Sequence, residues 1–423
     1  MSANRHHSVL IVGAGPVGFF LGYRLGKAGI KVDIIDKEPH IIQEPRASAY
    51  YGGAAFALKD AGLLRLVAER GYVATNFSWR TEVKDDGKGG KTWGDVLAEL
   101  NFDEADLDNP EKGMVLLPQP QFAELVMEQA LATDHVKVHF GSELTAIDNG
   151  NEAVTATVRD VNSGTERKIV SSFLVGADGG RSATRKLLNI SMQGHTWPER
   201  LIATDVLLPP NPLFLTVQSH FVIDPVHFAV VVPLAKRFEG QPSLWRFTVA
   251  VSAADPRSDD EILQDDNLRS LYEKAMPGPR PMQYEIQRKA VYRIHQRLAS
   301  TLFKGRCVLA GDAAHLNNPI GAMGLTSGIL DADALADTLL MIFSEQQPVS
   351  LLQTYSDERR KVFQTFVDPT TTHNKLRIQR TADSAYEDWF MRTMKNPSPE
   401  IMAEFFTPYV STWRSDMAAL VAK

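Results

Sequence analysis

Three aspartates, Asp36, Asp178 and Asp312, each close a short apolar run that has the composition of a buried strand. Asp178 and Asp312 stand beside glycine in a turn, and Asp36 closes the strand that follows a glycine-rich GAGPVG turn. A carboxylate at a strand end can accept hydrogen bonds from sugar hydroxyls, and a glycine turn that opens a helix presents free N–H groups to a phosphate. The chemistry that these residues suit is the binding of a nucleotide.

The segment of residues 304–343 contains the last of these aspartates. Residues 307–310 have strand character and stop at Gly311 and Asp312, and the loop that follows holds Pro319, Gly321 and Gly324. Apolar residues then recur at helical spacing up to residue 343. We therefore expect a strand, an acid, a glycine turn and a helix N-terminus, which together make an anion site beside a carboxylate. Taken alone, the segment is equally explained by an ordinary turn that Asp312 caps.

The first motif lies between residues 8 and 36. An apolar strand over residues 8–13 runs into glycines at 13, 15 and 18, a helix is predicted over residues 16–28, and a second strand ends at Asp36. Gly13 permits the tight turn, Gly15 lets the backbone approach a pyrophosphate, and Asp36 can accept from a ribose hydroxyl. The alternative is a glycine-rich turn without a ligand, but the order of strand, glycines, helix, strand and acid favours a dinucleotide.

Three further polar residues have both a functional and a structural interpretation. Arg181 follows Asp178, and the two residues suit a pyrophosphate and ribose or form an ion pair that fixes the turn. Arg46 follows the second strand closely enough to face a phosphate or a ring, or it pairs with Glu44 on the surface. Gln119 precedes an amphipathic helix, where it either reaches a cofactor or caps the helix.

The elements that must position these residues fall into two groups. A helix is predicted over residues 53–69, an irregular excursion over residues 72–112, and a three-stranded meander before Asp178 with turns at residues 148–151 and 162–165. Residues 190–295 are rich in alternating apolar segments, which predicts an antiparallel sheet with one face covered and one helix over residues 259–275.

The chain after residue 343 has a helical pattern. Residues 351–366 contain the charge run ERRK at residues 358–361, which we interpret as a solvated helix face. Residues 386–421 are amphipathic and hold Trp389 and Trp413. This tail can serve as core packing, a dimer contact or a weak membrane contact, in that order of preference.

Composition limits the classes of partner. The chain has 423 residues, 44% of them apolar and 23% charged, with a net charge of −6, so it is an ordinary globular chain and nucleic acid is not an expected partner. Cys307 is the only cysteine, which excludes internal disulfides and cysteine-based metal sites, and we expect no metal ion. The N-terminus lacks the pattern of a signal peptide, and the longest uncharged run is interrupted by prolines. We expect a cytoplasmic protein without an integral membrane segment, as a monomer or homodimer.

Three separated motifs together resemble the single-component flavoprotein monooxygenases of the aromatic hydroxylase family, which use FAD. GAGPVG with Asp36 resembles that family's adenosine-binding start, LVGADGGRSATR its Asp-Gly motif, and GRCVLAGDAAHLNNPIGAMGLTSGILDADAL its Gly-Asp motif. The likeness spans about residues 8 to 360. The family commonly has glycine where Ala322 stands and asparagine where Thr326 stands, so the flavin loop is a point of departure.

The resemblance implies the cofactor and its contacts. Asp312 is expected to bind the ribityl or ribose hydroxyls, Pro319 to lie against the flavin, and the N–H groups near residues 324–326 to face the N1/C2=O edge. The full set that we expect to hold FAD is Gly13, Gly15, Pro16, Val17, Gly18, Asp36, Lys37, Arg46, Gln119, Asp178, Arg181, Gly311, Asp312, Pro319, Gly321, Gly324, Leu325 and Thr326.

The resemblance also implies a fold of class α/β. We expect a Rossmann-like FAD-binding domain, an inserted and mostly antiparallel β-sheet that forms the substrate domain, and a C-terminal helical segment. The expected boundaries are residues 1–75, 112–190 and 296–345 for the FAD-binding domain, 76–111 and 191–295 for the substrate domain, and 346–423 for the helical region.

The implied reaction is hydroxylation. NADPH or NADH delivers hydride to the flavin, O2 forms a C4a-hydroperoxide, and one oxygen atom passes to a small phenolic or polyketide-like substrate. A helix N-terminus suits the anionic reduced flavin. If deprotonation of the substrate assists, His220, His227 and Tyr292 are conceivable bases, although a packing or surface role is the preferred interpretation of each. With Pro319 they complete the candidate catalytic set.

Other flavoprotein classes are weaker interpretations. No second GxGxxG follows the first, which argues against two-dinucleotide monooxygenases, and the single cysteine argues against disulfide reductases. The tryptophans form no WxW pair of the kind typical of tryptophan halogenases. A flavin oxidase or dehydrogenase on the same fold is the main alternative, and a non-enzymatic FAD-fold binding protein is a second one.

Overall fold

A six-stranded sheet carries the nucleotide-type motifs in the computed structural model, which describes residues 8–102 and 113–422. Five strands run parallel, and the last runs antiparallel to its neighbour. In spatial order they are β10 (Val136–His139), β2 (Lys31–Ile35), β1 (Ser8–Val12), β14 (Phe173–Gly176), β21 (Cys307–Leu309) and β20 (Phe303–Lys304).

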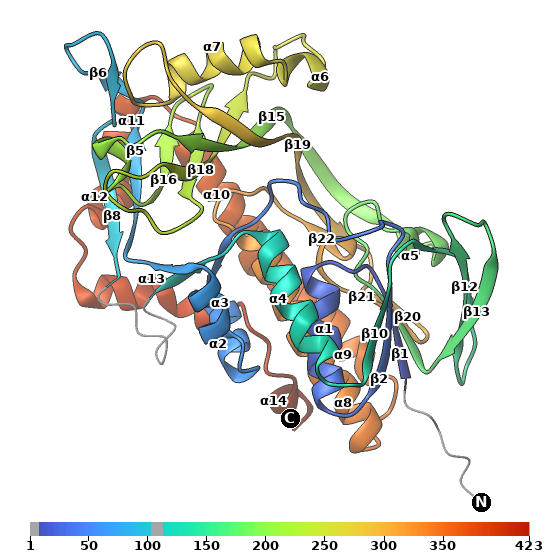
Figure 1. Ribbon diagram of the computed structural model, residues 1–423. Helices are drawn as coiled ribbons and strands as arrows, with labels where there is room; N and C mark the ends of the chain where they lie inside the picture. The colour runs from blue at the N-terminus through green and yellow to red at the C-terminus, as the bar shows by residue number, and fades with distance from the viewer. Residues whose placement is uncertain (1–7, 103–112, 423) are drawn as a thin grey trace, which may run out of the picture.

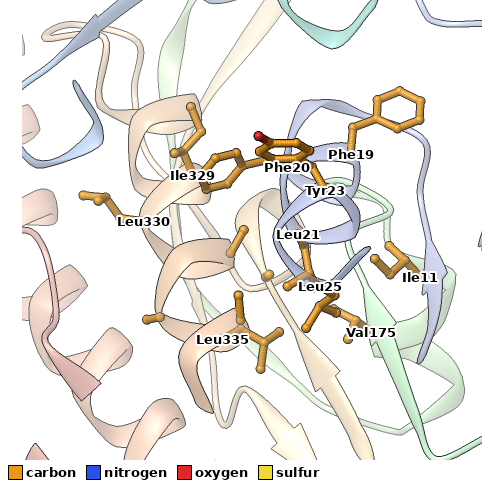
Figure 2. Close-up of a cluster of buried hydrophobic side chains, with 14 of the residues drawn as sticks. Ile11, Phe19, Phe20, Leu21, Tyr23, Leu25, Val175, Ile329, Leu330 and Leu335 are labelled. Atoms are coloured by element: carbon orange, nitrogen blue, oxygen red, sulfur yellow. The ribbon is translucent and has the colours of Figure 1, made fainter. Parts of the chain in front are cut away.

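Helices pack on this sheet because its central strands are apolar on both faces. On one side lie α1 (Pro16–Lys27), α4 (Gln119–Leu131) and α8 (Met323–Ser344). Figure 2 shows side chains of α1 and α8 meeting those of β1 and β14 in one cluster, with Phe20 beside Ile329. Gly22 allows the close packing of α1, since a Cβ there would lie 2.8 Å from Cδ1 of Ile34.

A second, eight-stranded sheet confirms the predicted antiparallel insertion, but both of its faces are covered, whereas one covered face was predicted. It is antiparallel except for one parallel pair, the strands Ser219–Ile223 and Asn76–Thr81. Its strands in order are β22 (His315–Leu316), β19 (Glu285–Ala299), β15 (Met192–Leu208), β18 (Ser243–Val251), β17 (Ala229–Pro233), β16 (Ser219–Ile223), β5 (Asn76–Thr81) and β8 (Val96–Asn101). The predicted α/β class, with a Rossmann-like part, an antiparallel insertion and a helical C-terminal segment, is confirmed.

The two faces of the eight-stranded sheet belong to different apolar clusters. Alternate residues such as Phe247 and Val249 pack against α7 (Asp265–Ala275) on what we call the outer face. Phe221 and Ala250 point to the inner face, where they meet Ile320 of the loop before α8. In Figure 1, α7 crosses one side of this sheet, and the red helices α10 (Asp368–Ile378), α11 (Ala382–Tyr386), α12 (Trp389–Met394) and α13 (Pro399–Ser411) lie on the other.

A buried ion pair joins the eight-stranded sheet to the surroundings of the first motif. Arg246 of β18 donates from Nε and Nη2 to the Asp205 carboxylate of β15, at 2.7 and 2.9 Å. Its Nη1 donates to the carbonyl oxygen of Arg46. Asp205 is fully buried, so this fork contributes both charge compensation and geometry. The eight-stranded sheet is thereby tied to the segment that follows β2.

Three smaller sheets complete the strands. The predicted meander is present as β11 (Ser142–Asn149), β12 (Val154–Asp160) and β13 (Glu166–Ser171), which pair antiparallel in that order. The other two consist of β3 (Ala49–Tyr51), β9 (Met114–Leu116) and β4 (Tyr72–Ala74), and of β6 (Lys84–Asp85) and β7 (Lys91–Thr92).

Two helices predicted as continuous are divided. The helix expected over residues 53–69 is α2 (Gly53–Asp60) followed by α3 (Leu64–Arg70), because Gly62 adopts a φ of +83° between them. That left-handed conformation ends a helix. The helix expected over residues 259–275 likewise begins as the short α6 (Asp259–Ile262), which is closed by a separate turn before α7. The remaining helices are α5 (Ala183–Leu187), α9 (Leu351–Val362) and α14 (Met417–Val421).

Parts of the expected domains lie outside the described residues. These are residues 1–7 and 112 of the expected FAD-binding domain, residues 103–111 of the expected substrate domain, and residue 423. The domain boundaries stay predictions. Within residues 8–102 and 113–422, none of the helices combines the length and apolar character that crossing a membrane requires.

His220 lies on the outer face of β16 and is fully buried. Its ring meets Trp93 edge-on with centroids 4.7 Å apart, and Nδ1 lies 2.9 Å from the carbonyl oxygen of Gln218. Nε2 is buried and has no partner among the described residues. Burial lowers the pKa of His220 to about 3, with the Gln218 carbonyl opposing the shift and the charge of Arg80 adding to it.

This burial predicts a pH dependence of folding. Because the pKa of His220 is about 3 in the folded chain and 6.5 in an unfolded one, the unfolded chain binds the extra proton first as the pH falls. The stability contributed by this group is therefore present above pH 6.5 and is lost toward pH 3. Between pH 7 and 5, wild type should lose about 2 kcal/mol more unfolding free energy than a His220→Phe variant. Urea unfolding at the two pH values measures this difference, and equal losses would contradict the assignment.

Candidate functional site

The three predicted strand-end motifs meet at one edge of the six-stranded sheet. Since β2, β1, β14 and β21 are parallel neighbours, their carboxyl ends lie side by side. Gly13, Asp36, Asp178 and Asp312 follow these ends closely in the chain. This is the edge at which open parallel sheets bind ligands.

The first and second motifs touch through their backbones. A Cβ on Gly13 would lie 2.3 Å from the carbonyl oxygen of Ala177 and 2.8 Å from the amide nitrogen of Asp178. Gly18 is as tightly placed, because a Cβ there would lie 2.1 Å from the carbonyl oxygen of Gly13. Both positions require glycine for contact inside the protein, independently of any ligand.

Gly15 differs from these two glycines. A Cβ on it would meet no atom of the described residues within 4 Å, and α1 begins next to it without a side-chain cap. Asp36 holds the same turn from the side, since it accepts the N–H of Ala14 at 2.7 Å and that of Glu38 at 2.9 Å. The turn therefore presents an open backbone surface at the positive end of α1.

Asp178 organises the second motif without an ion pair to Arg181. Its carboxylate accepts from the Ser182 hydroxyl at 2.5 Å and from the Thr184 amide and hydroxyl at 2.9 and 3.0 Å, and Arg181 is exposed. The buried arginine of this segment is Arg185, which donates to the carbonyl oxygens of Gly180 at 2.8 Å and of Ala313 at 2.9 Å. Arg185 thus fastens the second motif to the third.

The third motif places Asp312 on the 3-10 turn Gly311–Ala313 directly after β21. Gly311 has a φ of +62°, and its position for a Cβ lies 3.1 Å from Cγ2 of Val17, so the turn packs against the start of α1. No group of the described residues donates a hydrogen bond to the Asp312 carboxylate. Burial raises its pKa; Arg46 and His315 oppose this, and Asp331 adds to it.

The loop between Asp312 and α8 is held by a chain of hydrogen bonds. The backbone N–H of Asn318 donates to Oε1 of Gln296 at 3.0 Å, and the backbone N–H of Ile320 donates to Oδ1 of Asn318 at 3.0 Å. The Tyr51 hydroxyl donates to the carbonyl oxygen of Gly321 at 2.5 Å. Pro319 stands exposed in the middle of this fixed loop.

No side chain of the described residues caps the N-terminus of α8. Its N-cap, Ala322, adopts a left-handed φ of +55°, which explains why glycine suits this position in the family that the sequence resembles. The hydroxyl of Thr326 donates back to the Ala322 carbonyl at 2.8 Å. Oδ1 of Asn317 is buried without a partner among the described residues, and it lies 3.8 Å from the position of a Cβ on Gly324. Unsatisfied polar groups therefore surround this helix end.

The other predicted cofactor residues are placed around this edge. Arg46 pairs with Glu44 at 3.1 Å, as the structural alternative predicted, yet its charge also acts on Asp312. Gln119 is the first residue of α4, and its backbone N–H donates to the carbonyl oxygen of Ala47 at 2.9 Å. Lys37 is exposed and its Nζ lies 3.7 Å from the Glu38 carboxylate. Pro16 is the first residue of α1, and Leu325 belongs to the first turn of α8.

The four candidate catalytic residues fall on two sides of the eight-stranded sheet. Tyr292 is on the inner face, in the same cluster as Ile320, and its hydroxyl is buried without a partner among the described residues. Burial raises the pKa of Tyr292 to about 12 against the charges of Arg46 and Arg246. His220 lies on the outer face, and His227 lines an outer cavity of about 460 Å³. Of the four, Tyr292 and Pro319 are brought to the Asp312 side.

Sequence reasoning missed a buried pair behind the third motif. The charge run at residues 358–361 was predicted to face solvent, which is wrong for Arg359, because its side chain is 1% exposed and its Nε lies 2.7 Å from Asp331. Asp331 is fully buried within α8. The available signal was an acid in the apolar stretch of residues 325–343, which requires a buried basic partner.

The arrangement fits an extended anionic cofactor such as FAD. It offers an open backbone cradle at Gly15, a carboxylate without a donor among the described residues at Asp312, and an uncapped helix end beside Asn317. Gly13 to Gly18 would hold the pyrophosphate, Asp36 the adenosine ribose, Asp312 the ribityl chain and the start of α8 the flavin.

Comparison with known proteins indicates the same cofactor. The family described as FAD binding domain matches residues 6–370. The para-nitrophenol 4-monooxygenase of Pseudomonas sp. (strain WBC-3) is 34% identical over 367 residues, with 86% of each chain covered. The 6-hydroxy-3-succinoylpyridine 3-monooxygenase of Pseudomonas putida is 28% identical over 387 residues, covering 91% of this chain and 92% of that one. The crystal structure of a p-nitrophenol 4-monooxygenase from Pseudomonas putida superimposes with a TM-score of 0.84 at 31% identity, covering 95% and 98%.

The open backbone at Gly15 predicts that a substitution there weakens FAD binding without weakening folding. Gly15 has a φ of −97°, which alanine adopts freely, so Gly15→Ala should change the unfolding free energy by less than about 1 kcal/mol. Its methyl group would occupy the approach to the pyrophosphate, and the FAD dissociation constant should rise at least about tenfold. Flavin fluorescence titration measures this constant.

The matched control is Gly29→Ala at the other end of α1. Gly29 also has free space for a Cβ but a φ of +81°, so this variant should lose stability and keep its FAD affinity. Unchanged FAD affinity in the Gly15 variant would contradict the cradle assignment.

Proposed function

The chain belongs to the FAD binding domain family and is a flavin-dependent monooxygenase of the aromatic hydroxylase group, and on this premise we propose that it inserts one oxygen atom of O2 into a small phenolic substrate while consuming NADPH or NADH. The observation that carries the proposal is the meeting of Asp36, Asp178 and Asp312 at one sheet edge beside the uncapped start of α8.

The substrate side of the proposal is supported by relatives of similar length. Two relatives that match over most of both chains are named for a nitrophenol and a hydroxypyridine, each a single aromatic ring with a hydroxyl group. We therefore favour a single-ring phenol over the polyketide-like substrate that the sequence left open. When bound, FAD would accept hydride from NAD(P)H and activate O2 at its C4a position.

Residues of this chain would provide the environment for that chemistry. The start of α8 would stabilise negative charge on the reduced ring, and Asp312 would orient the chain that carries it. Met114 and Val230 pack against two apolar clusters. One cluster contains Ile320, and Ala322 packs against the other, so the two clusters flank Gly321. Apolar groups at this position would keep water from the reacting atoms.

Tyr292 is the proposed polar contact for the substrate. Its raised pKa of about 12 keeps the phenol neutral near pH 7, so it would donate a hydrogen bond to a substrate oxygen rather than remove a proton. His220 and His227 stand behind the sheet, which argues against their use as bases.

The proposal predicts substrate-stimulated turnover with incorporation of oxygen. Single-ring phenols such as 4-nitrophenol should accelerate NADH or NADPH oxidation at least about tenfold over the rate without substrate. Products formed under isotope-labelled O2 should contain one labelled oxygen atom. Absorbance of the nicotinamide and mass spectrometry of the products provide the two readouts.

The panel also separates the alternatives. If polyketide-like compounds stimulate turnover and phenols do not, the substrate is polyketide-like and not a single-ring phenol. Oxidation of a substrate without NAD(P)H, and without label in the product, would overturn the monooxygenase reaction in favour of an oxidase.

A further inference from the structure

Asp331 is a carboxylate in the third turn of α8 that is fully removed from solvent. Its Oδ2 accepts the Gly311 amide at 2.9 Å and lies 2.7 Å from Nε2 of His315. Its Oδ1 accepts Nε of Arg359 at 2.7 Å. One buried acid therefore binds the first residue of the turn that carries Asp312 and the histidine that follows this turn.

Packing alone does not account for an acid at this position. Replacing a buried ion pair by apolar residues of similar volume is often neutral or stabilising, because each buried charge must be desolvated. The neighbours of Asp331 along α8 are apolar, and the surrounding core is continuous. What an apolar side chain could not do is hold the amide of Gly311, which is the first residue of the 3-10 turn.

We propose that Asp331 is a positioning residue for FAD, which fixes the turn Gly311–Ala313 so that the carboxylate of Asp312 points to the cofactor. Gly311 has a left-handed φ of +62°, which glycine adopts without steric cost, and its amide is held by the Asp331 carboxylate. The next residue is Asp312, whose carboxylate has no donor among the described residues. The inference rests on the proposed role of Asp312 as a ligand of the FAD chain.

Arg359 connects Asp331 to the C-terminal segment. Its Nη1 donates to the carbonyl oxygen of Trp413 at 2.8 Å and to the hydroxyl of Ser415 at 3.0 Å. Nε1 of Trp413 donates in turn to the hydroxyl of Ser327 in the first turns of α8, at 2.9 Å. The fully buried Trp413 and Arg359 thus tie the C-terminal segment to α8 and α9, behind the turn that carries Asp312.

Asp333 provides a matched comparison two residues further along α8. It is also buried, at 2% side-chain exposure, and it also lies beside basic partners, Arg24 and Arg414. Its partners belong to α1 and the C-terminal segment, and the Gly311 amide is held by Asp331. Loss of either charge strains the same helix, whereas only loss of Asp331 releases the turn.

The test compares Asp331→Asn, Asp333→Asn and Asp312→Asn with wild-type holoenzyme. Gly311 and Arg359 bind different oxygens of the Asp331 carboxylate, and in asparagine one of these is replaced by an NH2 donor, so one of the two groups loses its acceptor. Free-flavin fluorescence on serial dilution of each holoenzyme measures the FAD dissociation constant, and urea unfolding measures stability. Asp331→Asn and Asp312→Asn should each raise the FAD dissociation constant about tenfold or more, and Asp333→Asn by less than about twofold.

The other outcomes would overturn the role of Asp312 or the role of Asp331. An unchanged constant in Asp312→Asn overturns the proposed role of Asp312. A raised constant there with an unchanged one in Asp331→Asn overturns the positioning role alone. Equal effects of Asp331→Asn and Asp333→Asn would also overturn it, since they would reflect general loosening of α8. If Asp331→Asn does not fold, Asp331→Glu decides, because it keeps the charge beside His315 and Arg359 but displaces the carboxylate by one methylene group from its position at the Gly311 amide. A rise of about tenfold supports the proposal, and an unchanged constant overturns it.

Discussion

The close approach of two backbones at Gly13 and Ala177 is the constraint on which the site depends. With 2.3 Å between the carbonyl oxygen of Ala177 and the position of a Cβ on Gly13, no side chain fits between the ends of β1 and β14. That contact brings the first two motifs together, and Val17 and Arg185 bring in the third by packing on Gly311 and by binding the Ala313 carbonyl. The glycines of the motif thus serve the fold at positions 13 and 18 and remain free for a ligand at position 15.

Electrostatics then divides the acids of this edge into two kinds. Asp331 is buried, but His315 and Arg359 outweigh the desolvation and hold its pKa below the ordinary value. Asp312 accepts no hydrogen bond from the described residues, and burial raises its pKa. One carboxylate is therefore occupied within the protein and the other is available to a ligand. This division follows from the partners of each side chain, because the two acids lie on adjoining elements of the same site.

Local patterns predicted the parts of the fold that short-range physics determines. The strand, glycine turn, helix and acid around Gly13, and the strand ends at Asp178 and Asp312, were correctly placed because spacing and turn chemistry act within a few residues. Arg359 was wrongly assigned to solvent, since its partner lies 28 residues earlier in sequence and no local pattern reveals a buried pair. The parallel pairing of β16 with β5 joins distant segments and is hidden for the same reason. His220 and His227 were candidate bases, but only the strand alternation in the folded sheet shows which face each of them occupies.

The structure of the holoenzyme with FAD bound tests most directly whether the three strand ends form one cofactor site. In that structure the pyrophosphate should lie over Gly15, a hydroxyl of the ribityl chain about 3 Å from the Asp312 carboxylate, and the flavin at the start of α8. FAD bound elsewhere, for example in the outer cavity that His227 lines, or an Asp312 carboxylate turned away from it, would contradict the account.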